Sequence, residues 1–339
     1  MKKLPSISII TITYNSDLKV FEQVLKALKK QKYPKKLIEH LVIDGGSTNN
    51  TVKLAKDYNC RVVIRPDLTE AEQVRASIGF KMAKNDIILI IQSDNIVTSK
   101  NWLLRMVQPF MDNPKVFCAF SEKNSYKKGS NILTRYCALF GVNDPTIYYL
   151  DKTEKIRMDE DRYNKGMIMN ETKDYYIVKF NRDNLPPLGD NGHMFLKSAI
   201  KKVSKDTKNY MHTDAFGELN DLGYDTVGVV KNTIIHVQKP DIIRSIKRRV
   251  DLKEKFYDRY RGKRKYLVYN PNSTRDRINL IKYILFSFTL VVPLYESIRG
   301  YFRIRDIAWF LHPLICILMI AGFGISEIKH YSKNLLKGN

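Results

Sequence analysis

Residues 38–48 read IEHLVIDGGST, an apolar run that ends in an acid, two glycines and two hydroxyl residues. A short apolar run predicts a buried strand, and the glycines predict the turn that follows it. We expect this strand at Ile38–Ile43, and similar runs predict strands at Ser6–Thr13, Arg61–Ile64 and Asp86–Ile91. These runs are apolar enough to predict that all four strands are buried on both faces, as in a parallel sheet.

Apolar residues at helical spacing fill the intervals between these strands. They predict helices at Asp17–Lys30, Thr48–Tyr58 and Thr69–Ala83. Asp and Thr commonly cap helix N-termini, so we expect caps at Asp17 and Thr48. Strands that alternate with helices indicate βαβ units, so the sequence predicts an α/β fold with a mostly parallel central sheet.

The composition limits the class of protein. At 339 residues and 39.6 kDa, the chain can form one large α/β domain or two smaller ones. Hydrophobic residues make up 44%, which excludes general disorder, and the sequence also excludes collagen, pure coiled coil and disulfide miniproteins. The net charge of +23 predicts an anionic partner, which could be nucleic acid, a phosphorylated substrate or an acidic membrane.

The cysteines and the N-terminus indicate the compartment. Cys60, Cys118, Cys137 and Cys316 form no CxxC pair, so we expect neither a zinc ribbon nor a disulfide framework, and infer a reducing compartment. The first residues lead into a short apolar run without a small-residue cleavage site. We therefore expect no signal peptide and a cytosolic start of the chain.

Residues 124–186 differ from the segment before them, because they are polar, rich in Tyr and Asn, and without sustained periodicity. This pattern predicts loops and short helices over a site, and a solvated insertion without a role would look the same. Globular character returns at Leu188–Leu196, Thr213–Leu222 and Thr226–His236.

The last hundred residues are basic and then apolar. Between Arg244 and Lys265 there are eleven Lys or Arg residues and three acids, with apolar residues interleaved, which predicts a basic amphipathic arm. Two apolar stretches follow, Ile278–Leu294 and Ile307–Ile325, of 17 and 19 residues. About 20 residues are needed to cross a bilayer as a helix, so a membrane-docked tail is the simplest interpretation.

The arrangement of this tail stays open between three alternatives. Two crossings would put the basic connector Tyr295–Asp306 on the outer side, against the positive-inside rule. Lys282, Pro293 and the His312-Pro313 pair favour a re-entrant or interfacial hairpin. Two buried core helices of a soluble domain are the third alternative.

Polar residues end three of the predicted strands, where ligands bind in open parallel sheets. The polar ends are Thr11–Asn15, Asp44–Thr48 and Gln92–Asn95, and together they predict one crevice for a polar ligand. Asp44 could accept hydrogen bonds from a base or ribose, although Ser47 and Thr48 could merely cap the next helix. Asp94 could bind a divalent cation that bridges a diphosphate, although a lone aspartate in a turn is often structural.

Six segments in order resemble motifs of the family-2 glycosyltransferases with the GT-A fold, and the resemblance covers roughly residues 5 to 240. The segments are Ser8–Asn15, Val42–Thr51, Gln92–Asn95 at the DxD position, Gly189–Gly192, Thr213-Asp214 with Leu219 and Gly223-Tyr224, and His236. The resemblance implies a GT-A domain, Rossmann-like, that performs inverting transfer from a nucleotide-diphospho-sugar with Mn²⁺ or Mg²⁺.

The resemblance also implies roles for individual residues. Its nucleotide-sugar site would contain Thr11, Tyr14, Asn15, Asp44, Gly45, Ser47, Gln92, Ser93 and Asp94. It implies that Asp94 and His236 bind the metal, that Asp214 is the general base, and that Asn191 and Gly192 contact the acceptor. Asp214 could instead be a helix N-cap, and His236 a structural histidine. Arg248 and Arg249 of the basic arm could attract a lipid phosphate.

Four residues depart from the family pattern. Gln92 replaces the first acid of DxD, Gly45 a frequent second acid, Thr213 the usual Glu before Asp214, and Ile12 a frequent proline. The change at Gln92 leaves Asp94 without a neighbouring acid, so we expect metal binding to be more affected than the fold.

Family members with such tails often act on lipid-linked acceptors at the cytosolic membrane face. We therefore expect an acceptor that is a lipid-linked saccharide or polyprenyl phosphate, an anionic membrane as partner, and a cytoplasmic catalytic domain at the cell membrane. The resemblance to the family implies a UDP-sugar as the donor. The corresponding parts are a catalytic domain at 1–240, a basic arm at 241–277, two hydrophobic helices at 278–325 and a basic tail at 326–339.

Two other functions fit the sequence less well, namely nucleotidyl transfer and nucleic-acid binding. Nucleotidyl transfer would ordinarily need a first loop rich in Gly with Arg or Lys, and here that loop is Thr-Tyr-Asn. No RRM, KH or zinc-finger pattern is present, so we expect no nucleic-acid partner. A catalytically inactive, glycosyltransferase-like membrane scaffold remains the alternative, and a homo-oligomer stays open because an apolar patch could serve another subunit.

Overall fold

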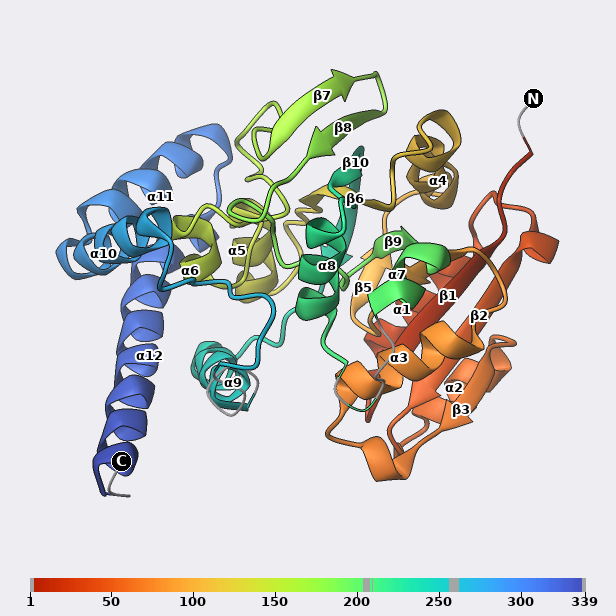
Figure 1. Ribbon diagram of the computed structural model, residues 1–339, viewed down its shortest axis with the longest axis horizontal. Helices are drawn as coiled ribbons and strands as arrows, with labels where there is room; N and C mark the ends of the chain where they lie inside the picture. Colours follow the sequence, from red (N-terminus) through yellow and green to blue (C-terminus); the bar gives the residue numbers. More distant parts are fainter. Residues whose placement is uncertain (1–2, 204–207, 209, 256–261, 337–339) are drawn as a thin grey trace. The chain divides into compact units, whose positions relative to one another are not determined.

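The computed structural model describes residues 3–203, 208, 210–255 and 262–336 (Figure 1). The chain divides into two compact units, each built from several segments of the sequence. The sheet unit comprises Met1–Ser125, Glu154–Ile156 and Arg162–Val237. The helical unit comprises Tyr126–Thr153, Arg157–Asp161 and Gln238–Asn339. The second unit therefore takes in part of the polar segment 124–186 as well as the C-terminal helices.

One mixed sheet forms the centre of the sheet unit. Its strands, as far as the structure describes the chain, are β1 (Ile7–Thr13), β2 (Ile38–Asp44), β3 (Arg61–Ile64), β4 (Ile87–Ile90), β5 (Asn95–Val97), β6 (Cys118–Asn124), β7 (Met167–Glu171), β8 (Tyr175–Lys179), β9 (His193–Leu196) and β10 (Thr226–His236). Their order is β3-β2-β1-β4-β9-β6-β10-β8-β7, and β5 pairs with β10.

The direction of the strands confirms an α/β fold whose core is mostly parallel. β1 pairs in parallel with β2 and β4, and β2 with β3. Beyond β4 the pairing changes, because β9 is antiparallel to both β4 and β6, and the β7–β8 hairpin is antiparallel to β10. The four predicted strands are present, but burial of all four on both faces was wrong for β3. It lies at the sheet edge, and its first and last residues are exposed.

The helices of the sheet unit follow the predicted alternation. They are α1 (Leu18–Lys29), α2 (Thr51–Asp57), α3 (Glu72–Met82), α4 (Trp102–Asp112), α7 (Lys197–Val203) and α8 (His212–Asp221). Asp17 caps α1 as predicted, because its carboxylate accepts from the backbone N–H groups of Lys19 and Val20. The predicted cap at Thr48 was wrong. α2 begins at Thr51, and Thr48 N–H instead donates to Asn15 Oδ1 at 2.9 Å.

Apolar side chains from strands and helices form the core of the sheet unit. Ile9 and Leu89 from adjacent central strands lie in one cluster with Phe21 of α1 and Trp102 of α4, and all four are at most 1% exposed. Burying one such side chain contributes about 1.5–3 kcal/mol to the stability of the fold. The core therefore holds the carboxyl ends of β1, β2 and β4 in fixed positions.

The helical unit contains α5 (Ile132–Phe140), α6 (Pro145–Tyr149), α9 (Ile242–Lys253), α10 (Thr274–Thr289), α11 (Val291–Arg303) and α12 (Leu311–Leu336). The segment 124–186 thus carries two helices of this unit and the β7–β8 hairpin of the other, so its prediction as loops and short helices was incomplete. α9 covers part of the predicted basic arm, and residues 256–261 of that arm lie outside the described residues.

The first apolar stretch is not one helix. α10 and α11 meet at an angle of 78° across Leu290, which has the left-handed φ of 59°. Within the described residues, Ile307–Ser332 is the one helical stretch long and apolar enough to cross a membrane by itself, and the bent pair passes the same test only as a broken span. About a third of the apolar window in Ile307–Ser332 is buried, and core helices of soluble proteins can pass this test too.

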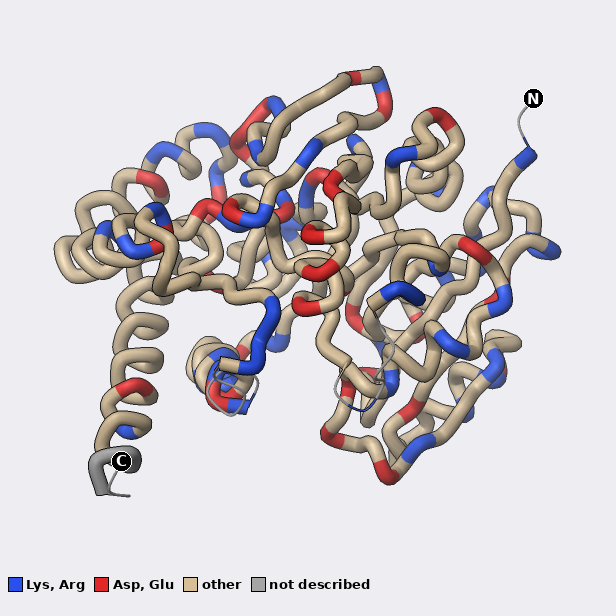
Figure 2. Tube along the Cα trace, viewed as in Figure 1, with Lys and Arg blue, Asp and Glu red and all other residues tan. Residues whose placement is uncertain are grey.

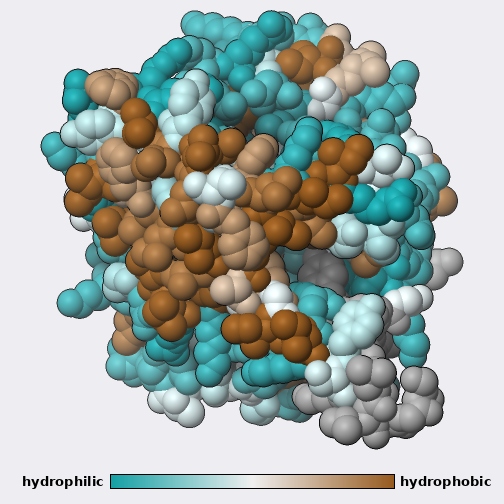
Figure 3. Space-filling model, turned by 90° about the vertical axis from the view of Figure 1, so that its left-hand side faces the viewer, coloured by the Kyte–Doolittle hydropathy of each residue, from teal (hydrophilic) through white to brown (hydrophobic). Residues whose placement is uncertain are grey.

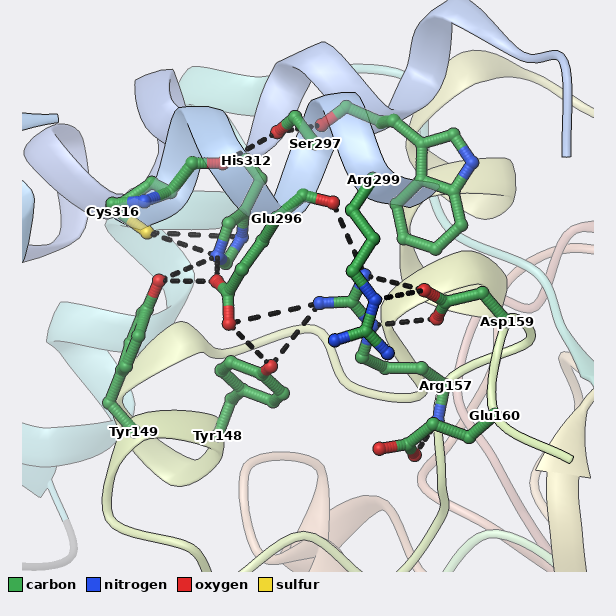
Figure 4. A network of polar contacts seen from close by, with 12 residues as sticks. Tyr148, Tyr149, Arg157, Asp159, Glu160, Glu296, Ser297, Arg299, His312 and Cys316 are labelled. Carbon is green, nitrogen blue, oxygen red and sulfur yellow. Dashed lines mark hydrogen bonds and ion pairs between the residues drawn. The ribbon is translucent and has the colours of Figure 1, made fainter. Parts of the chain in front are cut away.

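Polar side chains gather in the interior of the helical unit (Figure 4). Glu296 of α11 accepts hydrogen bonds from the hydroxyls of Tyr148 and Tyr149, both at 2.7 Å. His312 of α12 is fully buried, and its Nε2 lies 3.2 Å from the same carboxylate. Helices α6, α11 and α12 are thus joined by one acid.

An arginine extends this network toward residues 157–161. Arg157 binds the carboxylate of Asp159 through Nε at 2.8 Å and Nη2 at 3.0 Å, and both residues are almost fully buried. Its Nη1 donates to the Tyr148 hydroxyl at 3.2 Å. We call these six residues, from Tyr148 to His312, the helical-unit network.

Candidate active site

The carboxyl ends of three parallel strands meet at one edge of the sheet, as the sequence predicts. Thr13 at the end of β1 donates from Oγ1 to Asp44 Oδ2 at the end of β2, at 2.7 Å. Ser16 beyond β1 donates to Ser93 beyond β4, at 2.9 Å. These two side-chain hydrogen bonds join residues far apart in the sequence, so the three polar strand ends form one continuous edge.

Asp44 closes the turn that follows β2. Its Oδ1 accepts from the backbone N–H groups of Gly46 and Ser47, at 2.9 and 2.7 Å. Its Oδ2 accepts from the hydroxyls of Thr13 and Ser47, at 2.7 and 2.6 Å. Asp44 is fully buried, so in this conformation its carboxylate shapes the turn Gly45–Ser47 and is not presented to a ligand.

The residues at the end of β1 divide into buried and accessible ones. Thr11 is fully buried, and its hydroxyl lies 3.0 Å from Nε2 of His40. Burial lowers the pKa of His40 to about 4, so this imidazole is neutral at physiological pH. Tyr14 and Asn15 are exposed, and Asn15 Oδ1 holds the Asp44 turn through Thr48. Tyr14, Asn15 and the turn can therefore reach a nucleotide more directly than Thr11.

Arg75 of α3 is a site residue that the sequence analysis missed. It is 3% exposed, and its Nη1 donates to the backbone carbonyls of Leu68 and Thr69. A Cβ at Gly45 would lie 2.7 Å from Arg75 Nη1, so glycine is required there while the guanidinium keeps this place. The signal in the sequence was one arginine among the small residues of the inner helix face.

Asp94 and His236 come together because β5 pairs with β10. Asn95 is the register partner of His236, and the backbone N–H of Val237 donates to the Asp94 carbonyl at 2.9 Å. Asp94 Oδ2 then lies 3.9 Å from His236 Nε2, and both side chains are partly exposed. No group of three or more His, Cys, Asp or Glu residues that could hold a metal occurs among the described residues.

This pair of donors fits a divalent cation that is shared with a ligand. A carboxylate oxygen and an imidazole nitrogen are ordinary ligands of Mn²⁺, and Mg²⁺ often takes only one or two protein ligands beside substrate phosphates. The remaining ligands would have to come from a diphosphate and water.

The glycine loop Gly189–Gly192 directly precedes β9 in the chain, and in space it packs between the end of β4 and α8. Gly192 N–H donates to the Ile90 carbonyl at 2.9 Å, which fixes the loop beside the end of β4. A Cβ at Gly189 would lie 2.6 Å from the Phe216 ring, so the loop packs closely on α8. Asn191 and Gly192, the predicted acceptor contacts, both have left-handed φ values, of 49° and 86°.

Gln92 and two residues that the sequence analysis did not select, His193 and Glu154, hold this loop. Gln92 Nε2 donates to Asp190 Oδ1 at 2.6 Å. His193 is fully buried, and its Nδ1 accepts from the backbone N–H of Gly189 at 2.8 Å. On the other side of the ring, Nε2 lies 2.9 Å from Glu154 Oε2. Glu154 comes from the polar segment 124–186, where the sequence carried no local signal of chemistry.

Asp214 is the third residue of α8, the helix whose His212 and Phe216 pack on Gly189 of the glycine loop. The cap of this helix is Met211, so the alternative that Asp214 is an N-cap was wrong. His212 Nδ1 lies 2.8 Å from Gln73 Oε1, which ties the start of α8 to α3. A carboxylate in the first turn is favoured by the helix dipole.

Arg248 and Arg249 belong to α9 of the helical unit, whereas Asn191 and Gly192 belong to the sheet unit. Because the two pairs belong to different units, the binding of an acceptor by these four residues stays a prediction.

The model of the family "Glycosyl transferase family 2" matches residues 8–204, more than half of the chain and most of the sheet unit. This chain belongs to glycosyl transferase family 2. Its sequence resembles "Probable glycosyltransferase YdaM" of Bacillus subtilis (strain 168), with 24% identity over 143 residues that cover 40% of this chain and 34% of the relative. It also resembles the "Poly(ribitol-phosphate) beta-N-acetylglucosaminyltransferase TarS" of Staphylococcus aureus (strain Mu50), with 27% identity over 109 residues.

The match to TarS covers 31% of this chain and 18% of the relative, so this family-2 chain spans only about a third of the first relative and less of the second. Among solved structures, it shares its fold with "Mannosyltransferase PcManGT from Pyrobaculum calidifontis in complex with GDP-Man and Mn2+". The TM-score is 0.51 at 13% identity, over 99% of this chain and 88% of the other. The GT-A architecture predicted from the motifs is therefore confirmed.

Proposed function

We propose that this chain is an inverting glycosyltransferase that moves a sugar from a nucleotide-diphospho-sugar to a lipid-linked saccharide or a polyprenyl phosphate. The observation that supports this most directly is the single sheet edge that carries the Asp44 turn, the Asp94–His236 pair and the glycine loop. Such an edge can hold an extended ligand with a nucleoside at one end and a diphosphate near its middle. A UDP-sugar is the donor class to test first.

Asp94 and His236 hold a divalent cation in this proposal. When bound, the cation neutralises the charge that develops on the departing diphosphate. The 3.9 Å between their donor atoms supports a shared ligand, and the solved mannosyltransferase with the same fold carries Mn²⁺ with its nucleotide sugar. The turn Gly45–Ser47, with Tyr14 and Asn15, holds the nucleoside.

Asp214 acts on the acceptor. If the acceptor is a sugar hydroxyl, the Asp214 carboxylate accepts the hydroxyl proton as the new bond forms, and Gln73 keeps the start of its helix in place through His212. If the acceptor is a phosphate, it is already ionised, and Asp214 only orients it. Replacement of Asp214 therefore distinguishes the two classes of acceptor.

The helical unit supports docking on a membrane. Figure 3 shows a broad apolar area on the side where α10, α11 and α12 lie. Large apolar side chains exposed on these helices include Ile281, Leu285, Phe288, Val291, Leu294, Tyr295, Ile298, Phe302, Leu314, Ile317, Ile325 and Ile328. Exposed apolar areas of this extent mark binding surfaces. A lipid bilayer can cover such a surface without a partner protein of complementary shape.

Charges on the same helices favour an anionic surface (Figure 2). The acids on α10 and α11 and in the connector before α12 are inside the unit: Asp276 pairs with Lys152 at 2.6 Å and Asp306 with Arg135 at 2.9 Å, while Glu296 belongs to the helical-unit network. Glu327 of α12 is partly exposed and pairs with Lys253 of α9. The cations are exposed, namely Arg275, Arg277, Lys282, Arg299, Arg303 and Arg305, of which Arg275 and Arg303 pair with Asp151 and Asp161. Each cation near an anionic lipid surface contributes about 1 kcal/mol. We propose that the transferase works at the cytosolic face of the cell membrane.

The alternative is an inactive, glycosyltransferase-like membrane scaffold, and the observation that favours it is Gln92 in place of an acid. One experiment decides between the two. Full-length protein in detergent is given UDP-, GDP- and dTDP-sugars with Mn²⁺ or Mg²⁺, and polyprenyl phosphate or a lipid-linked saccharide as acceptor.

Metal-dependent transfer that Asp94→Asn abolishes would support the enzyme, with the exposed Asp183→Asn as the matched control. Loss in Asp214→Asn as well would indicate a hydroxyl acceptor. Absence of both transfer and calorimetric nucleotide-sugar binding in the wild type would leave the scaffold.

A further inference from the structure

We propose that Asp190 supplies the carboxylate that the strand-end motif lacks at Gln92, and that Gln92 and Asp190 together bind hydroxyl groups of the transferred sugar. This inference rests on the proposed function, because it assigns the sugar end of the same donor site. It also gives Gln92 a role other than that of a lost metal ligand.

The contact between the two side chains is short and polar. Gln92 follows β4, Asp190 lies in the glycine loop, and Gln92 Nε2 donates to Asp190 Oδ1 at 2.6 Å. A hydrogen bond to an ionised carboxylate is stronger than one between neutral groups, so this pair is held in one arrangement. An acid at position 92 would instead face Asp190 with the same charge.

One oxygen of Asp190 is left for a ligand. Oδ1 accepts both from Gln92 and from the backbone N–H of Asn191, the latter at 2.8 Å. Oδ2 accepts none of the hydrogen bonds found among the described residues, and Asp190 is partly exposed. A carboxylate oxygen accepts from a sugar hydroxyl, and the Gln92 amide oxygen can accept from another.

A buried pair holds the loop that carries Asp190. His193 Nδ1 accepts from Gly189 N–H at 2.8 Å and lies 3.3 Å from the N of Asp190. Because Nδ1 is an acceptor, the ring N–H is on Nε2, which faces Glu154 at 2.9 Å. Glu154 thus orients His193, and His193 orients the loop. Both are positioning residues.

The order of the strands places this pair away from the Asp44 turn, on the other side of β1 and β4. Along the sheet the order is β2, β1, β4 and β9, so the Asp44 turn and the glycine loop lie on opposite sides of β1 and β4. Asp94 is two residues beyond Gln92, and its backbone carbonyl accepts from the N–H of Val237 after β10. A donor with its nucleoside at the turn and its diphosphate at Asp94 would therefore have Gln92 and Asp190 beside its diphosphate end, where the sugar is attached. The loop packs on α8, which carries the proposed base Asp214.

The test exchanges the two groups. Four full-length proteins are compared: wild type, Gln92→Asp, Asp190→Asn, and the double variant Gln92→Asp/Asp190→Asn, which restores one carboxylate and one amide with their places reversed. Calorimetry with Mg²⁺ measures binding of UDP-glucose, UDP-N-acetylglucosamine and GDP-mannose, with UDP and GDP as probes that lack the sugar. The unfolding temperature without ligand is measured in parallel, and Asp183→Asn is the control for loss of a carboxylate.

We expect each single variant to bind the preferred nucleotide sugar about tenfold more weakly or worse, because a hydrogen bond to a charged group is lost or replaced by repulsion. Binding of the sugar-free nucleotide should stay within about threefold of wild type, since the pair contacts only the sugar. The double variant should recover most of the sugar-dependent binding, and also the unfolding temperature that Gln92→Asp lowers.

Two results would overturn the proposal while the transferase itself stands: nucleotide-sugar binding by Gln92→Asp that equals or exceeds wild type, or equal weakening of nucleotide and nucleotide-sugar binding. If wild type binds no nucleotide sugar at all, the proposed function fails first, and this inference fails with it.

Discussion

The two units of this chain put polar and apolar side chains in opposite places. In the sheet unit the core is apolar, and polar groups such as Asn15, Asp94 and Asp190 lie at the partly exposed strand ends. In the helical unit a network around Arg157 and Glu296 is buried. Most of the exposed large apolar side chains among the described residues lie on the surface of this unit. The first arrangement suits water and a polar ligand. The second suits a surface in contact with lipid.

Both units nevertheless contain a fully buried histidine beside a carboxylate. His193 faces Glu154 at 2.9 Å, and His312 faces Glu296 at 3.2 Å. The first pair holds a loop next to the ligand edge, whereas the second joins helices by bonds to tyrosines. The same chemical pair thus has a different consequence in each unit, and the variants below test that difference.

The largest effect should come from the interior of the helical unit. Arg157→Ala leaves the buried Asp159 carboxylate without its two-point partner, and breaking a buried ion pair in this way costs about 3–5 kcal/mol of unfolding free energy. Arg162→Ala is the control, because Arg162 pairs with Glu171 at the surface, where a pair contributes less than about 1 kcal/mol. Denaturant unfolding in the same detergent measures both. Equal losses would mean that the network adds nothing special.

The next effect concerns the outside of that unit. Phe302→Asp on α11 should weaken binding to vesicles of anionic lipid about tenfold, because burying a phenyl ring in lipid contributes about 1.5–3 kcal/mol. Met167→Asp on β7 is similarly exposed but belongs to the sheet unit, and should leave vesicle binding unchanged. Co-sedimentation with anionic and zwitterionic vesicles checks this. A loss in both variants, or in neither, would remove the distinction between the two surfaces.

Exchange of the buried histidines compares the two pairs directly. His193→Ala removes the acceptor of the Gly189 N–H and should cost about 1–3 kcal/mol of stability, together with a loss of nucleotide-sugar binding. His312→Ala removes the contact with Glu296 and should lower stability without changing nucleotide-sugar binding. Calorimetry at a temperature where both variants are folded separates these outcomes. If the two variants lost the same binding, the division of roles would be wrong.

Sequence alone predicts the sheet unit well and the helical unit poorly. The strands β1, β2 and β4 and their polar ends can be predicted from short apolar runs and from the turn residues that follow them, because these signals involve only neighbouring positions in the sequence. Glu154, Asp190 and His193 could not be chosen in this way, because their contacts depend on residues distant in the chain. The break at Leu290 also carried no signal, since leucine rarely adopts a left-handed φ and the nearby Pro293 suggested a different position.

The smallest predicted effect is a pH dependence that belongs to the sheet unit. Burial would raise the pKa of Glu154, but His193 and Lys155 beside it hold the pKa below its ordinary value of 4.5. The folded state therefore binds this proton less readily than the unfolded chain, so Glu154 contributes stability that is complete above about pH 4.5 and is lost as the pH falls through the lower, folded-state pKa.

Glu154→Gln lacks this contribution, so its deficit in unfolding free energy relative to wild type should be constant at neutral pH and should shrink below about pH 4.5. Denaturant unfolding from neutral to acid pH measures the deficit, and Asp183→Asn, which changes an exposed carboxylate, should follow wild type throughout. A deficit that grows with acid would mean that Glu154 is protonated in the folded protein. The carboxylate would then not orient His193, and the glycine loop would be held by the histidine alone.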